Sequence, residues 1–124
     1  MKIHDFKLSS LALLLLVCLP FVAFGEDEET RCVPPGDPPA VPDGRRSSQS
    51  QMTEAMAEVR EYLGYSAGFR ECVEKLLLKQ GDDAPEKVKK AALNLIQESL
   101  ETDELLGSLF NQQVRVFKSL NPPD

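Results

Sequence analysis

The sequence predicts an all-α fold: a long antiparallel two-helix hairpin whose extended, Pro-rich N-terminal strap is disulfide-linked to helix one. Three observations predict it. Apolar residues recur at helical spacing over two long segments, and a short loop containing Gly81 and Pro85 separates the segments. Two cysteines, Cys32 and Cys72, remain once a signal peptide is removed. A chain of 124 residues is expected to form one domain.

Residues 1–25 have the pattern of a secretory signal peptide. Basic residues precede an apolar run at 11–19, and Ala23 and Gly25 supply the small residues of a cleavage site before Glu26. The run is too short to span a bilayer, and the acidic residues after it argue against an uncleaved anchor. We therefore expect a periplasmic or secreted protein, cleaved near Gly25, with no stable membrane insertion.

The charge of the chain excludes one class of partner. The formal net charge is −6 at pH 7, and loss of Lys2, Lys7 and Asp5 with the signal peptide would make it −7. An acidic chain without a basic stripe repels phosphate backbones and anionic membrane surfaces. We expect no nucleic-acid partner; the partner is an unknown protein or a second copy of the chain.

The cysteines predict a structural disulfide. Cys18 leaves with the signal peptide, so an even number remains for an oxidising compartment. A metal site or a redox pair is the alternative. His4 is the only histidine, and Cys32 and Cys72 lack the C-x-x-C spacing of thiol oxidoreductases. A Cys32–Cys72 bridge is the favoured prediction, and no metal or other cofactor is expected.

Residues 26–47 combine an acidic leader with the Pro-rich strap. Five prolines fall within residues 32–44, a density that excludes helix and central strand and favours polyproline II. A disordered linker or a ligand for SH3-type domains is the alternative. With a disulfide at one end, we expect an ordered strap that ends in the turn Pro42-Asp43-Gly44.

The helical hairpin is predicted over residues 48–120, with helices at about 48–80 and 84–120. Ser48 with Gln51 fits a capping box at the start of the first helix, and Gly81 is expected to stop it in a left-handed cap. Asp83 is predicted to cap the second helix, with Pro85 in its first turn. The short loop makes the helices antiparallel neighbours.

In such a hairpin residue i faces roughly residue 165 − i, so Met52 and Met56 meet Phe110 and Phe117 at the open end. A second apolar seam is also predicted, and the strap is expected to close over it. Val33, Pro34, Pro35 and Val41 of the strap would enter this groove. The seam joins Tyr65, Phe69, Cys72 and Leu76 of the first helix to Leu93, Ile96 and Leu100 of the second.

Two pairs of residues are candidate interaction surfaces. Gly64 and Gly68 lie inside the first helix, where glycine costs stability, and suggest close approach of the strap or a second subunit. A local bend, or simple tolerance of glycine, is the alternative. Asn111 and Arg115 lie four residues apart on a polar face and form either a recognition patch or a surface hydrogen bond.

No catalytic motif is present, and no histidine would remain as a general base. Ser99, Thr102 and Gln113 interrupt the apolar stripe; they either line a small polar site or set the register as core positions. Paired carboxylates are expected on outward faces or in the loop. These pairs are Glu71 with Glu74, Asp82 with Asp83, Glu98 with Glu101, and Asp103 with Glu104.

Several motifs follow one another along the chain. Cys32 opens Cys-x-x-Pro, Pro42-Asp43-Gly44 comes next, Cys72 lies in Phe-Arg-Glu-Cys-Val-Glu, and residues 110–118 read Phe-Asn-Gln-Gln-Val-Arg-Val-Phe-Lys. Over most of residues 32–118 this order resembles an uncharacterised family of small secreted proteins of proteobacteria. The resemblance implies a periplasmic setting and a two-cysteine helical hairpin, and it implies no activity.

These observations favour a secreted or periplasmic, non-enzymatic helical protein with a binding or structural role. Self-association into a four-helix bundle fits, because each helix of a lone hairpin buries only one stripe. A small periplasmic chaperone that uses the groove is an alternative. An enzyme using clustered carboxylates is another, and would need an acidic cleft with strongly shifted carboxyl pKa values.

Overall fold

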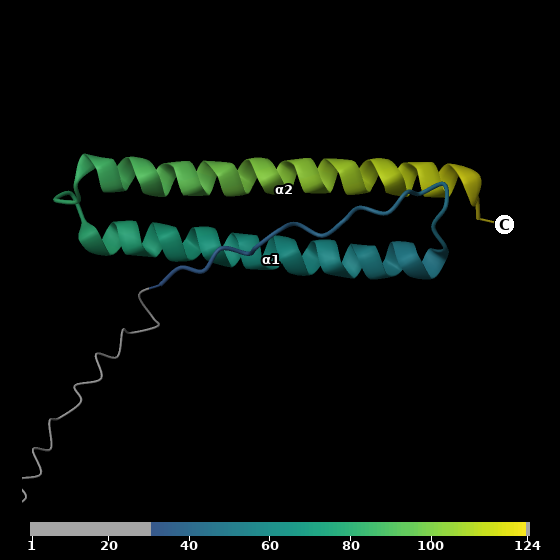
Figure 1. Ribbon diagram of the computed structural model, residues 1–124, viewed down its shortest axis with the longest axis horizontal. Helices are drawn as coiled ribbons and strands as arrows, with labels where there is room; N and C mark the ends of the chain where they lie inside the picture. Colours follow the sequence, from purple (N-terminus) through teal and green to yellow (C-terminus); the bar gives the residue numbers. More distant parts are fainter. Residues whose placement is uncertain (1–30, 124) are drawn as a thin grey trace, which may run out of the picture.

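The computed structural model describes residues 31–123 and contains two helices, α1 (Gln49–Gln80) and α2 (Glu86–Leu120). The helices lie side by side and antiparallel, joined at one end by a short loop (Figure 1). This confirms the predicted all-α hairpin. The signal peptide and most of the acidic leader lie outside the described residues.

Helix α1 begins and ends at the residues that the sequence indicated. Gln51 donates its backbone N–H to Ser48 Oγ (3.2 Å), and Ser48 donates its own to Gln51 Oε1 (2.8 Å), which completes the capping box. Gly81 stops the helix with a φ of +65°, in the region that favours glycine. Its ψ of −159° differs from that of the expected left-handed cap.

The predicted cap of the second helix is wrong. Pro85, not Asp83, occupies the N-cap position, and no side chain caps the helix. The carbonyl of Pro85 accepts hydrogen bonds from the N–H groups of Val88 (2.8 Å) and Lys89 (3.1 Å), which closes the first turn. Pro85 itself has an extended ψ of 138°, so the helix begins after Pro85, and Asp83 lies too early to reach its N–H groups.

The core is a single layer of side chains between the helices, densest toward the open end. At mid-length the Ser66 hydroxyl lies 2.7 Å from that of Ser99, which is the predicted register. The predicted contact of the methionines with the phenylalanines at the open end is also present. The main buried cluster consists of Met52, Ala55, Val59, Tyr62, Leu106, Phe110 and Phe117, with Met56 packed against it.

The strap begins beside the loop-side part of α1, near Cys72, and crosses the hairpin toward the C-terminal end of α2, where it turns into α1 (Figure 1). Its first end is held by the Cys32–Cys72 disulfide, with a Cα–Cα distance of 5.6 Å. Its second end is held at Gly44, whose N–H donates to Gln113 Oε1 at 2.9 Å. Between them Val41 packs on the core, so the predicted disulfide-linked strap is confirmed.

The predicted seam under the strap is only half right. Phe69 is buried and Cys72 half-buried on the strap's side of α1. Tyr65 remains 65% exposed, and Leu93 and Leu100 of α2 are 58% and 45% exposed. In their place the strap shares a surface hollow with Thr102, Leu105, Leu106, Leu109 and Gln113.

Helix geometry explains the error on α2. Leu93 lies two residues before Leu95, which places it about 160° away around the helix. Leu95 lines the strap's side of the hairpin, so Leu93 and Leu100 face the opposite flank. Val33 of the strap, expected inside the groove, is 73% exposed.

Candidate functional site

The two mid-helix glycines lie on the exposed surface of α1. A Cβ atom added at Gly64 or Gly68 would meet nothing within 4 Å. The strap therefore does not approach them closely, and that part of the prediction is wrong. A second subunit at this surface stays a prediction.

Gly44 is the glycine at which backbones do approach closely. A Cβ atom there would collide with the carbonyl oxygen of Gln113 and lie 3.0 Å from the backbone nitrogen of Phe117. Gly44 is itself buried. The Pro-Asp-Gly turn was visible in the sequence, but its contact with α2 was not, because nothing local specifies which part of the hairpin a strap end reaches.

Asn111 and Arg115 are both exposed on α2. Four residues separate them, so they share one outward face, as predicted. A recognition role for this patch stays a prediction.

A buried polar cluster lies halfway along the hairpin. Arg70 Nη1 donates to Ser66 Oγ (2.9 Å), Ser99 Oγ (2.9 Å) and Asp103 Oδ2 (2.6 Å). The side chains of Arg70 and Asp103 are only 18% and 14% exposed. The prediction of Asp103 as an outward surface carboxylate is therefore wrong.

The sequence did carry a signal for this cluster. Ser66 faces Ser99 in the predicted register, and Arg70 and Asp103 each lie one helical turn from these serines, in opposite directions along the hairpin. Ser99 thus sets the register, one of the two roles considered for it. Gln113 instead accepts from the strap, and Thr102 donates to the Glu98 carbonyl in its own helix (2.9 Å).

Tyr62 is the one buried phenol near this cluster. Burial raises the pKa of Tyr62, and the carboxylates of Asp103 and Asp37 raise it further. The phenol therefore stays neutral and points its hydroxyl at the Gly36 carbonyl of the strap, at a long 3.5 Å. Its role is to hold the strap, since a raised pKa makes it a poor base.

The surface carboxylates show ordinary helix pairing. The Lys75 ammonium lies 2.7 Å from Glu71, and this hydrogen bond lowers the pKa of Glu71. In residues 31–123 no group of three or more His, Cys, Asp or Glu side chains is placed to hold a metal ion. Neither helix of this part of the chain is long and apolar enough to cross a lipid bilayer.

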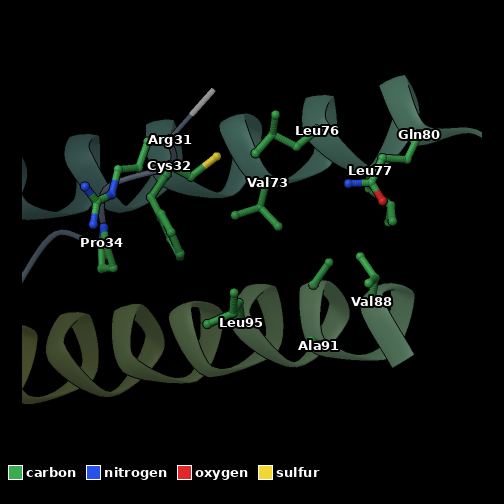
Figure 2. A pocket seen from close by; sticks show the side chains of 12 residues that line it. Arg31, Cys32, Pro34, Val73, Leu76, Leu77, Gln80, Val88, Ala91 and Leu95 are labelled. Carbon is green, nitrogen blue, oxygen red and sulfur yellow. The ribbon is translucent and has the colours of Figure 1, made fainter. Parts of the chain in front are cut away.

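An apolar groove lies between the helices on the loop side of the disulfide, and we call it the loop-side groove. It encloses about 380 Å³, and Val73 of α1 and Leu95 of α2 point toward one another across it (Figure 2). The strap closes only its inner end. It is lined by Arg31, Cys32, Pro34, Phe69, Val73, Leu76, Leu77, Gln80, Val88, Ala91, Ala92 and Leu95.

Two apolar surfaces of the hairpin lie on opposite sides: the loop-side groove on the strap's side, and on the other the open flank of the exposed Leu93 and Leu100 with the half-buried Ile96. Both suit binding by shape and apolar contact. Comparisons of the chain with protein-family models, curated proteins and solved structures find no match.

Proposed function

We propose that this protein is a secreted, non-enzymatic binding protein whose disulfide-strapped hairpin associates with a second copy through the open flank. The observation that carries the proposal is the exposure of Leu93 (58%) and Leu100 (45%), which lie seven residues apart on one face of α2. Ile96 lies between them. Apolar side chains in such a row are characteristic of helix–helix interfaces.

The sequence of α2 complements itself along this flank. An antiparallel pairing of two α2 helices about the Ile96–Gln97 bond sets Leu93 against Leu100 of the second copy. The same pairing sets Lys89 near Glu104, at both ends of the contact by symmetry. Two hairpins joined in this way make a four-helix assembly, in which α2 of each copy gains a second buried stripe.

Sedimentation equilibrium of the purified protein tests the proposal. We expect a concentration-dependent dimer that a Leu93→Glu, Leu100→Glu double variant reduces to a monomer, because four carboxylates would then meet at the interface. Leu105→Glu is the matched control: Leu105 is 61% exposed but lies on the strap's side. A wild-type chain that stays monomeric at high micromolar concentration would exclude the second copy as the partner.

Secretion is part of the same proposal. The disulfide supports it, because structural disulfides persist in oxidising compartments, and so does the resemblance to small secreted proteins. Expression of the full chain in a Gram-negative host should give a periplasmic product. Its measured mass should match a chain that begins at Glu26. An uncleaved product, which still carries residues 1–25 and stays in the cytoplasm, would contradict the proposed secretion.

A chaperone-like role is the second candidate, favoured by the exposed leucines beside the strap, Leu105 and Leu109. It predicts that the protein suppresses aggregation of a denatured client, and does so better after reduction has loosened the strap. If neither the oxidised nor the reduced form suppresses aggregation, the chaperone-like role is excluded and the proposed dimer remains.

A further inference from the structure

We propose that the loop-side groove is a binding site for a single-chain alkyl carboxylate, with the alkyl chain between α1 and α2 and the carboxylate at Arg31. This inference goes beyond the association of hairpins. The groove and the open flank lie on opposite sides of the molecule, so either proposal can fail without the other.

The lining of the groove defines the ligand's polarity. Of its twelve residues, Arg31 is the only charged one and Gln80 the only other with a polar side chain outside the disulfide. Carboxylates are absent from the lining, so Arg31 supplies the one charge that the groove itself presents. One cation at the end of an apolar groove complements an anion with an apolar body.

The shape favours an unbranched chain. Phe69 and Gln80 mark the two ends on α1, and eleven residues of helix separate them by about 16 Å. Val73 of α1 and Val88 and Leu95 of α2 form the walls, and Val88 and Leu95 are still 39% and 44% exposed (Figure 2). An alkyl chain of about this length would cover the apolar surface that the strap leaves open.

An extended peptide fits less well. Each residue of a peptide brings an N–H and a C=O that need hydrogen-bond partners when they are desolvated. The strap meets this requirement with prolines, which lack the N–H, whereas beyond Cys32 the groove offers only Gln80. An alkyl chain has no such groups.

The disulfide positions the cation. Arg31 directly precedes Cys32, which is bonded to Cys72 on α1. The guanidinium is thereby kept at the inner end of the groove, beside Pro34 (Figure 2). Reduction of the bridge releases this anchor, so affinity should depend on the redox state through Arg31.

Titration calorimetry with octanoate, decanoate and dodecanoate, below their micelle concentrations, tests the site on the oxidised protein. Each pair of added methylenes should tighten binding by up to about 15-fold until the groove is full. Arg31→Gln should weaken dodecanoate binding about fivefold and leave dodecanol binding unchanged. Arg45→Gln, which removes an equal charge at the far end of the strap, is the control.

A second pair of variants separates the groove from general surface binding. Ala91→Phe should fill the groove and remove dodecanoate binding, whereas Ala57→Phe, on the outer face of α1, should not. Reduced wild-type protein should bind dodecanoate like oxidised Arg31→Gln. The proposal would be overturned if dodecanoate does not bind even at millimolar concentration, or if neither Ala91→Phe nor Arg31→Gln changes its binding. In either case, a dimer observed in sedimentation would still support the proposed function.

Discussion

Arg70 holds the polar part of the interior together. Its guanidinium joins two hydroxyls and a carboxylate, and so connects α1 to α2 at one register. A slip of the helices would leave Arg70 and Asp103 buried without partners, at a cost of several kcal/mol. The cluster therefore specifies alignment in a hairpin whose apolar stripes alone would tolerate several.

Removal of the carboxylate should be costly. We expect Asp103→Ala to lower the free energy of unfolding by about 3 kcal/mol, because it leaves the Arg70 charge without its partner. Urea denaturation measures the loss. Glu104→Ala removes the exposed neighbouring carboxylate and should change stability by less than about 0.5 kcal/mol; equal losses in the two variants would refute the role given to the buried pair.

Two glycine-to-alanine changes should act in opposite directions. Gly44→Ala forces the strap's end away from Gln113 and should cost about 2 kcal/mol. Gly64→Ala places its methyl group in open space within a helix and should stabilise by about 1 kcal/mol. Thermal unfolding of the two variants measures whether each substitution lowers or raises the stability. A loss of stability in Gly64→Ala would indicate a contact at that surface.

Tyr62 should make stability fall at alkaline pH. Its pKa in the folded chain is raised, so its contribution is complete below its ordinary pKa of about 10 and is lost as the pH rises through the higher folded value. The free energy of unfolding, measured from about pH 8 to pH 11, should decline more in the wild type than in Tyr62→Phe. Parallel declines would mean that other groups cause the loss.

At the scale of elements, the strap serves as a third layer for two helices that cannot enclose a core alone. The disulfide fixes one end and Gly44 the other, and between them prolines extend the chain without unpaired N–H groups. Its contact with Tyr62 and the core covers the open-end part of one of the two grooves that a hairpin leaves open, and the loop-side groove remains.

Loss of the disulfide should destabilise the whole hairpin. Its closure of about 41 residues stabilises by roughly 4 kcal/mol in the loop-entropy picture, so the Cys32→Ser, Cys72→Ser variant should lose up to that amount in urea denaturation. Reductant should destabilise the wild type to the same extent and leave the double variant unchanged. A stable reduced wild type would show that packing alone holds the strap.

The sequence predicted these elements because their signals are local. The capping box at Ser48, the glycine at Gly81 and the proline-rich composition each act within a few residues, and the cysteine pair needed no geometry. The side of α2 under the strap was wrong, because the periodic pattern showed a second stripe without showing which flank of α1 it accompanies. Asp103 was missed because a charged residue on a helix is usually solvated, and its burial depends on Arg70 in the partner helix.

At the scale of the whole molecule, only one stripe of each helix is well buried, and apolar residues remain exposed on both flanks. A hairpin of this size has little surplus stability, which is why the strap and the disulfide matter. The same exposed residues provide the surfaces for the proposed dimer and the proposed ligand.

The Cys32–Cys72 bond also determines how the molecule would transmit mechanical load. A pull applied at the two ends of the chain passes from Cys32 directly to Cys72, and the strap and about the first six turns of α1 lie in a covalent ring outside that path. In a single-molecule pulling experiment, the segment between Cys32 and Cys72, a sequence separation of 40 residues, does not extend until reductant opens the ring. The extension should then grow by about 140 Å, at up to 3.6 Å per residue, while α2 bears tension under both conditions.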